Sequence, residues 1–229
     1  GASSRVLDGV NKLSKQGQED SETGTVVDHM VKTALWEIGI LEELDFDLIK
    51  ISVKAFDVPT TVEAYKRLAE LIPYPLHLGI TEAGTVAAGS IRSAVGLGII
   101  LGMGIGDTIR VSLAGDPVNE VEAGYDILKS LNLRQKGITL IACPSCGRAD
   151  VDIIKWSNLV EEALKKTKKE GLKIAVMGCE VNGPGEAKDA DIGLAAGAGR
   201  GLIFRKGQKV RVIPEEEFLS ALIEEIEKI

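Results

Sequence analysis

Three short runs in the first half of the chain alternate between apolar and polar side chains, and this alternation restricts the possible folds more than any other feature. The runs are Ile49 to Val53, Leu76 to Ile80 and Thr108 to Leu113. Such runs predict β-strands with one polar face. Helical patterns separate them, so the order βαβα predicts an α/β fold with a parallel sheet. Because the strands of a doubly wound sheet are apolar on both faces, a (β/α)8 barrel of the TIM type with a ligand-facing interior fits better.

Three side chains stand where these strands are expected to end. Lys54, Glu82 and Ser112 follow one another at intervals of about 30 residues, the length of one βα unit. In a barrel, the carboxyl ends of the strands surround the active site. A barrel has eight strands and about three precede Cys143, so we expect the C-terminal part of a barrel. The chain also begins without an initiator Met, and we expect it to be a fragment.

The second half of the chain predicts a smaller α/β layer. Strands are expected at Ile138 to Ala142 and at Lys173 to Gly178, with a helix from Asn158 to Glu170 between them. A strand pair follows around the segments DIGLAAG and GLIFRKG, and a helix from Glu215 to Ile229 closes the chain. If the first two strands are parallel neighbours, their carboxyl ends lie at one edge of the sheet.

The composition argues against several classes of function. A net charge of −7 disfavours nucleic acids and anionic membranes as partners, since both attract concentrated positive charge. The longest weakly polar run, Ser93 to Gly106, is too short and too rich in glycine to span a bilayer, and it predicts a buried helix. The printed start shows no apolar secretion signal, and three cysteines suit a disulfide framework poorly. We therefore expect a cytoplasmic protein whose thiols serve packing, metal or redox roles.

The cysteines occupy the positions that the two later strands bring to one edge. Cys143 and Cys146 follow the first of these strands, and Cys179 follows the second. Glu186 comes shortly afterwards in the turn-rich segment NGPGE, which can return a side chain towards Cys179. A [4Fe–4S] cluster needs four ligands, so three thiolates and one displaceable carboxylate form a candidate set. A structural zinc site and a thioredoxin-type redox pair remain open as alternatives.

The polar strand ends allow both functional and structural interpretations. Glu82 could act as a general acid/base at the mouth of a barrel, or it could simply be an acid near a helix N-terminus. His77, further down its strand, is better explained as an interior structural residue. Lys54, Arg110 and the nearby Ser112 could hold a diphosphate, or the cations could form salt bridges within the barrel wall.

Several motifs, in order and with matching spacings, resemble one family. The motifs are KISVK, HLGITEAG, GDTIRVSLAGDP, CPSCGR and MGCEVNGPGEA. From about Val26 to its C-terminus, the chain resembles the 4-hydroxy-3-methylbut-2-enyl diphosphate synthases of the methylerythritol phosphate route to isoprenoids. The resemblance implies a partial TIM-type barrel over residues 1–135 and an α/β domain over residues 136–229 that holds a [4Fe–4S] cluster.

The resemblance also implies roles for individual residues. Glu82 matches the acidic residue of the family that is implicated in acid/base work. The positions that hold the substrate's diphosphate are matched by Lys54, Arg110 and Ser112. The cluster ligands are matched by three thiolates and one carboxylate, from Cys143, Cys146, Cys179 and Glu186.

The reaction that the resemblance implies is a two-electron reductive dehydration. It opens the cyclic substrate 2-C-methyl-D-erythritol 2,4-cyclodiphosphate and gives 4-hydroxy-3-methylbut-2-enyl diphosphate and water. Electrons reach the cluster from flavodoxin or ferredoxin, and the substrate oxygen displaces Glu186 from the iron. Members of this family are dimers in which the cluster domain of one subunit closes over the barrel of the other. The resemblance therefore implies an iron–sulfur oxidoreductase that works as a homodimer.

Two departures from the family pattern qualify these expectations. The earlier barrel strands, with their basic residues, do not occur in the printed chain, so we expect no turnover from it alone. Phe56 stands where the family usually has a small polar residue after Ala55. The rival interpretation from another functional class is a non-catalytic metal-binding module, either a structural zinc domain or an iron–sulfur electron carrier.

Overall fold

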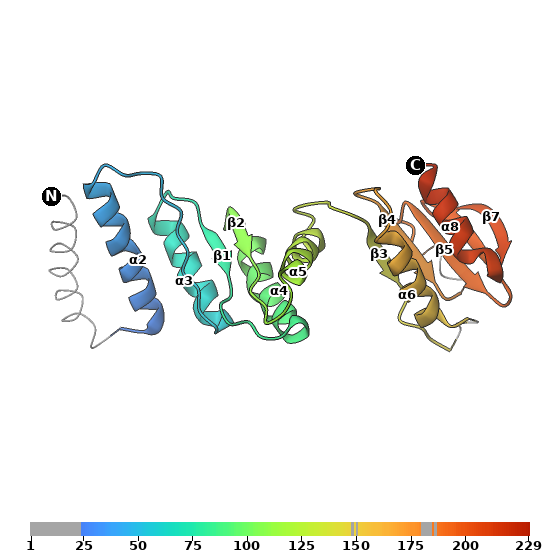
Figure 1. Ribbon diagram of the computed structural model, residues 1–229, viewed down its shortest axis with the longest axis horizontal. Coiled ribbons are helices and arrows are strands. Elements are labelled where there is room, and N and C mark those ends of the chain that lie inside the picture. The colour runs from blue at the N-terminus through green and yellow to red at the C-terminus, as the bar shows by residue number, and fades with distance from the viewer. Residues whose placement is uncertain (1–23, 148, 150, 180–184, 186) are drawn as a thin grey trace. The chain divides into compact units, whose positions relative to one another are not determined.

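The computed structural model describes residues 24–147, 149, 151–179, 185 and 187–229. Contacts divide the chain into two compact units, Gly1–Leu131 and Asn132–Ile229, and each is described by itself. Both units combine helices with parallel strands (Figure 1), which confirms the predicted α/β class. Within the described part of the chain, no helix has both the length and the apolar composition needed to cross a membrane.

In the described residues of the first unit, four helices pack with a short parallel sheet. The strand β1 pairs with β2 in parallel, and Gly79 lies opposite Arg110. In chain order, the elements of this unit are α2 (Val26–Glu43), α3 (Val58–Leu71), β1 (His77–Gly79), α4 (Val86–Gly102), β2 (Thr108–Arg110) and α5 (Pro117–Ser130).

Local sequence explains where these helices begin. At the start of α2, the hydroxyl of Thr25 accepts the N–H of Asp28 while the Asp28 carboxylate accepts the N–H of Thr25, which is a capping box. Before α3, the Asp57 carboxylate accepts the N–H of Thr60 at 2.8 Å. Before α5, Asp116 does the same for Val118 at 2.9 Å. These three helices therefore begin at an acceptor side chain that satisfies a backbone donor of the first turn, whereas α4 has no side-chain cap.

The segment predicted as the first strand, Ile49 to Val53, forms only a single bridge, between Ile51 and Leu76. Side chains of α3 explain why the ladder stops there. The N–H of Val53 donates to the Tyr65 hydroxyl at 3.2 Å, and the N–H of Ala55 donates to the Thr61 hydroxyl at 3.2 Å. These donors are therefore taken by α3, and the prediction of a regular strand here is wrong.

The core of the first unit lies between the strands and the helices. The strands and the residues next to them contribute Leu76, Leu78 and Val111, and the helices contribute fully buried side chains such as Tyr65 and Leu97. Because alternate residues of a strand point to opposite faces, the polar residues of the same strands lie on the other face. The predicted separation into an apolar helix-facing side and a polar side is confirmed by this burial.

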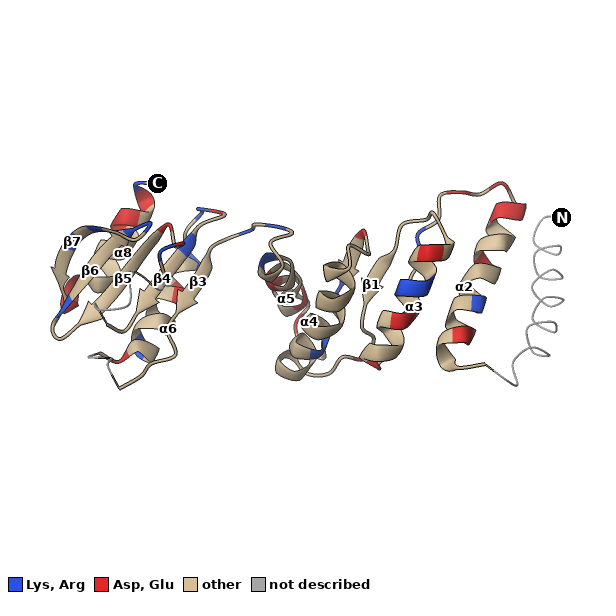
Figure 2. Cartoon of the chain, turned by 180° about the vertical axis from the view of Figure 1, so that it is seen from behind, with Lys and Arg blue, Asp and Glu red and all other residues tan. Residues whose placement is uncertain are grey.

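The helix α4 is less buried than the run Ser93 to Gly106 predicted. Ser93, Leu97 and Ile100 are buried, whereas Ile91 and Val95 are at least half exposed. Arg92 is the one charged residue of this helix, which is nearly all tan in Figure 2. The predicted helix is therefore confirmed, but it is buried on one side only, because the other side does not meet the core.

In the described residues of the second unit, two helices pack on one face of a mixed sheet. The strand order is β3-β4-β5-β6-β7, with β3, β4 and β5 parallel and the later pairs antiparallel. Strand residues such as Ile174 and Leu194 share a core with Val160 of α6 and Phe218 of α8. The elements are β3 (Thr139–Ala142), α6 (Ile153–Leu164), β4 (Lys173–Met177), β5 (Ile192–Gly197), β6 (Arg200–Arg205), β7 (Gln208–Pro214), the 3-10 turn η1 (Glu215–Glu217) and α8 (Phe218–Glu227).

The helix α6 begins five residues earlier than predicted and ends earlier too. Its N-cap is Asp152, whose carboxylate accepts the N–H of Lys155 at 3.0 Å. The Lys-rich stretch after Leu164 leaves the helix and ends at Gly171, which has a φ of 74°. The Lys and Glu residues of that stretch resemble those of an exposed helix, so the prediction placed the end of α6 too late. The same pattern of charges also suits a solvent-exposed turn.

Candidate functional site

Two cations from different segments of the first unit lie close together on the polar side of the strands. The Lys54 side chain passes over Gly79 of β1, the residue that pairs with Arg110 of β2. Partial burial, followed by the charges of Arg110 and Lys50, lowers the pKa of Lys54 below its ordinary value. No ion pair among the described residues includes Lys54 or Arg110, so the alternative of a salt bridge within the wall has no support there. The pair can therefore attract an anion.

His77 lies two residues before Gly79 in β1 and pairs with Thr108 of β2. A nitrogen of its ring, Nδ1, is 2.8 Å from the hydroxyl oxygen of Thr108, and its backbone carbonyl accepts the Tyr65 hydroxyl at 2.6 Å. Burial lowers the pKa of His77, and the charges of Lys54, Lys50 and Arg110 lower it further. The imidazole is thereby biased towards its neutral form, as suits a residue that packs beneath two cations.

Glu82 stands in the loop between β1 and α4. Its φ is 53°, in the left-handed region that few residues other than glycine and asparagine adopt readily. The loop is held at both sides, because Thr81 donates its N–H to Ala55 at 3.3 Å and Gly84 accepts the N–H of Ala114 at 2.8 Å. Its side chain is exposed, so a carboxylate is presented to solvent on a fixed backbone.

Phe56 and Arg92 support the same loop. The Arg92 guanidinium lies 4.3 Å from the centre of the Phe56 ring and also donates a hydrogen bond to the carbonyl of Ala83. Phe56, the residue that departs from the family pattern, therefore stacks on the cation that holds the residue after Glu82. The structural context gives this aromatic residue a role that the sequence motif did not indicate.

Ser112 follows β2 and is half-buried. The next residue, Leu113, donates its N–H to the Glu120 carboxylate of α5 at 2.8 Å. The sequence patterns did not indicate Glu120, Tyr65, Thr61 or Arg92, because their hydrogen bonds depend on how neighbouring segments pack against one another. Only Glu120 gave a signal, as an acid in the first turn of a helix.

In the second unit, the ends of β3 and β4 bring two cysteines into neighbouring positions. Ala142 pairs with Val176, and Cys143 donates its N–H to the Val176 carbonyl at 3.1 Å. The N–H of Gly178 donates to the Cys143 sulfur at 3.2 Å, one residue before Cys179. The predicted parallel pairing of these two strands is therefore confirmed.

Of the other two predicted ligands, the structure describes only Cys146. Cys146 is exposed in the turn after Cys143, where Ser145 has a φ of 67°. Glu186 lies outside the described residues. Among the residues that the structure does describe, no three His, Cys, Asp or Glu side chains are close enough to hold a metal ion. The four-ligand set accordingly stays a prediction.

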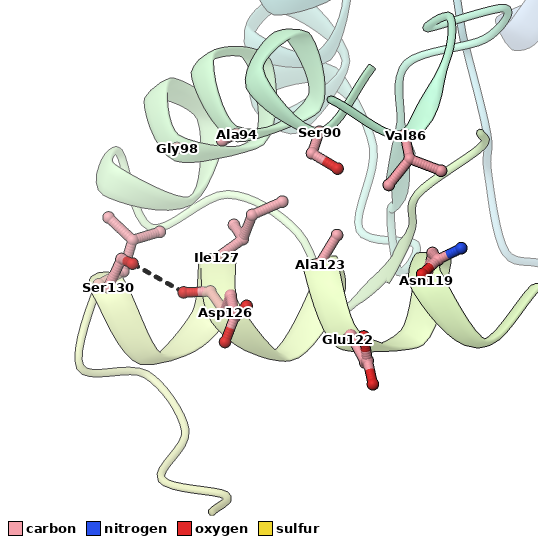
Figure 3. Close-up of a pocket in the computed structure, with 11 residues that line it drawn as sticks. Val86, Ser90, Ala94, Gly98, Asn119, Glu122, Ala123, Asp126, Ile127 and Ser130 are labelled. Atoms are coloured by element: carbon pink, nitrogen blue, oxygen red, sulfur yellow. Dashed lines mark hydrogen bonds between the residues drawn. The ribbon is translucent and has the colours of Figure 1, made fainter. Parts of the chain in front are cut away.

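A groove between α4 and α5 is separate from all these positions. It has a volume of about 370 Å³. Figure 3 shows Ala123 and Ile127 pointing towards α4, whereas Glu122 points away. None of the residues that the sequence predicted for a site lines it.

Comparison with known proteins gives two family matches in sequence order. The model of the GcpE TIM-barrel domain matches residues 3–125, and that of the GcpE protein C-terminal domain matches residues 139–228. The first match supports the predicted barrel, because it assigns more than half of the chain to a TIM-barrel domain.

Two relatives carry the same descriptive name, "4-hydroxy-3-methylbut-2-en-1-yl diphosphate synthase (flavodoxin)". The one from Dehalococcoides mccartyi is 61% identical over 202 residues, which cover 88% of this chain and 58% of the relative. The one from Geobacter sulfurreducens is 57% identical over 217 residues, which cover 95% of this chain and 60% of the relative. The chain thus spans about three fifths of the length of these relatives. Family models and relatives agree with the motif resemblance, and the chain belongs to the GcpE family of 4-hydroxy-3-methylbut-2-en-1-yl diphosphate synthases.

Proposed function

We propose that this chain is part of an enzyme that reductively opens 2-C-methyl-D-erythritol 2,4-cyclodiphosphate to 4-hydroxy-3-methylbut-2-enyl diphosphate. The balanced reaction consumes two electrons and two protons, breaks a ring C–O bond and releases one water. The observation that carries the proposal is the 61% identity, over 88% of the chain, to a relative named as this synthase. We further propose residues 1–135 as the barrel part and residues 136–229 as the cluster domain.

Lys54, Arg110 and Ser112 are proposed to hold the diphosphate. Lys54 and Arg110 lie close together without an acidic partner among the described residues, so a bound diphosphate would relieve their repulsion. Ser112 adds a hydroxyl donor in the segment that Glu120 fixes. Glu82 is proposed to donate a proton to the substrate hydroxyl that leaves as water, because its carboxyl is exposed at the end of the β1 segment.

The thiolates of Cys143, Cys146 and Cys179, with Glu186, are proposed to hold a [4Fe–4S] cluster. The chain fits such a group because the Gly178 N–H donates to the Cys143 sulfur, a contact that holds and tunes cluster thiolates. When bound, the cluster would supply single electrons at an iron that no thiolate holds. The relatives' names specify flavodoxin, and we propose flavodoxin, or else ferredoxin, as the electron donor. A cytoplasmic homodimer is proposed as the working form.

Metal analysis of oxygen-free material tests this proposal. After anaerobic purification, we expect iron and acid-labile sulfide in about fourfold excess over the chain, as one cube requires, together with the spectrum of an iron–sulfur protein. Cys143→Ser should lower both contents. Zinc without sulfide would contradict the proposal and favour a structural zinc domain.

A second assay separates a catalyst from an electron carrier. Glu82→Gln in the complete protein, with all barrel strands present, should lower turnover about a hundredfold or more while leaving the iron content unchanged. Unaltered turnover would remove Glu82 from the reaction. The printed chain alone should bind the cluster and show no turnover, because its described sheet supplies only β1 and β2 of a barrel.

A further inference from the structure

The backbone of β1 leaves little space at Gly79. This residue is buried, and a Cβ atom placed on it would lie 2.9 Å from the Arg110 carbonyl oxygen, 3.0 Å from Lys54 Cε and 3.2 Å from Lys54 Nζ. The contact with the Arg110 carbonyl is too short to form without a shift, and the two Lys54 contacts would require the end of that side chain to move by a few tenths of an ångström. The absence of a side chain at Gly79 is therefore what leaves room for the end of Lys54.

This space changes where the Lys54 charge can lie. Lys54 belongs to the segment that precedes α3, and Gly79 belongs to β1. By passing over Gly79, the lysine brings its ammonium group towards β2, which carries Arg110 opposite Gly79. A methyl group there would displace the end of Lys54 from this position.

We propose that Gly79 is a positioning residue of the anion site, because its missing side chain allows Lys54 to reach across β1 and bind a diphosphate jointly with Arg110. This inference rests on the proposed function, since it takes the diphosphate as the ligand of the two cations. It goes further because it makes the joint action of Lys54 and Arg110 depend on Gly79, a residue without a side chain.

The contact with the Arg110 carbonyl offers a competing explanation, in which Gly79 serves only the pairing of β1 with β2. A double-mutant cycle separates the two. We would measure the Kd of inorganic pyrophosphate by titration calorimetry for the chain and for Gly79→Ala, Lys54→Met and the double variant. Gly39→Ala is the matched control, because a Cβ at Gly39 of α2 meets no atom within 4 Å.

If Gly79 acts through Lys54, Gly79→Ala weakens pyrophosphate binding by about ten- to hundredfold, the range for one charge-assisted contact. The same substitution then has no further effect in the Lys54→Met background, and Gly39→Ala leaves the Kd unchanged. An equal loss in both backgrounds would overturn the inference in favour of strand pairing alone.

Failure of the proposed function gives a different result. If Lys54→Met itself leaves pyrophosphate binding unchanged, the anion site is wrong and the role of Gly79 fails with it. If Lys54→Met weakens binding but Gly79→Ala does not, only the inference fails.

Should Gly79→Ala fail to fold, a measurement on the unsubstituted chain decides. Selective labelling of glycine and lysine should show a nuclear Overhauser contact between the Gly79 Hα protons and the Lys54 Hε protons. Absence of that contact in the folded chain would overturn the inference.

Discussion

Among the single residues, Lys54 carries a charge that does not stabilise the folded protein. Burial and the neighbouring charges of Arg110 and Lys50 lower its pKa, and no acid among the described residues offsets them. An ammonium group in such a place destabilises the folded state relative to the unfolded chain. Cation clusters of this kind persist where a ligand needs them, at a cost in stability.

Lys54→Met should therefore stabilise the protein while it weakens anion binding. We expect a gain of roughly 0.5 kcal/mol in the free energy of unfolding at neutral pH, the lower end for removing unfavourable charge. Because the pKa of Lys54 is lower in the folded state, the unfolded chain binds more protons between that value and 10.5, so the stability of the parent chain rises with pH there. Urea unfolding across this interval, with and without pyrophosphate, checks both effects.

The opposite result would be informative. If Lys54→Met lowers the free energy of unfolding, the packing of the aliphatic part of the Lys54 side chain stabilises the protein by more than its charge destabilises it. Lys32→Met on the exposed side of α2 serves as the control, because it removes a charge far from this cluster in sequence.

The residue scale also shows what alternation in a sequence can and cannot predict. The alternation of apolar and polar residues predicted that Lys54 and Arg110 lie on one face, because successive side chains of an extended segment point to opposite sides. It could not indicate Gly79, since the space that this residue leaves depends on how two segments cross. Tyr65 was equally hidden, because its hydroxyl bonds residues 12 positions away on each side.

At the scale of elements, Tyr65 joins α3 to the two segments that carry Lys54 and His77. Its hydroxyl accepts the Val53 N–H and donates to the His77 carbonyl, and the residue is fully buried. Tyr65→Phe should lower the free energy of unfolding by about 1–3 kcal/mol, because it leaves a buried N–H unsatisfied. Tyr74→Phe is the matched control, since its hydroxyl bonds Glu42 at an exposed position.

Urea unfolding of both variants measures this difference. Equal stability of Tyr65→Phe and Tyr74→Phe would show that water replaces the lost hydroxyl and that the link between α3 and the strands is weak.

The start of α2 should be sensitive to acid. Hydrogen bonds from the Thr25 hydroxyl, the Thr25 N–H and Arg67 lower the pKa of Asp28 from 3.8 to about 2. A carboxyl whose pKa is lower in the folded state stabilises the fold above pH 3.8, and this stabilisation is lost as the pH falls towards 2. Asp28→Asn should therefore flatten the decline of the thermal midpoint between these values.

A midpoint that declines as steeply in Asp28→Asn would assign the acid sensitivity to other carboxyls. Asp45→Asn, at an exposed position after α2, should keep the slope of the parent chain.

Elements were predicted best where one pattern decided them. The segments predicted as strands in the second unit match β3 to β6 closely, whereas β7 was not predicted. The predictions failed where tertiary contacts decide. Hydroxyls of α3 take the donors of Val53 and Ala55, and solvated charges continue the helical pattern beyond the end of α6.

At the scale of the whole molecule, the second unit has a core of its own. Residues from β4, β5, α6 and α8 form one buried cluster, which includes Val160, Ile192, Phe218 and Leu222. We expect residues 132–229 to fold as an isolated polypeptide and to incorporate iron and sulfide at the same ratio per chain as the longer protein. Circular dichroism and anaerobic metal analysis measure the two properties.

If the isolated second unit folds but takes up no iron, then ligands of the cluster, or residues that shield it from solvent, lie outside residues 132–229. Cys146→Ser is the internal comparison. It alters an exposed side chain and should lower the iron content without changing the melting of the metal-free fold.

With the acid/base role proposed for Glu82, the backbone at this residue sets stability against activity. A non-glycine residue at a φ of 53° costs about 1–2 kcal/mol, and glycine or asparagine would relieve most of that cost. A laboratory population selected for heat resistance alone should drift to one of those two amino acids at this position. A population required to make isoprenoid precursors should retain the carboxylate. The two kinds of selection would therefore favour different amino acids at the same position.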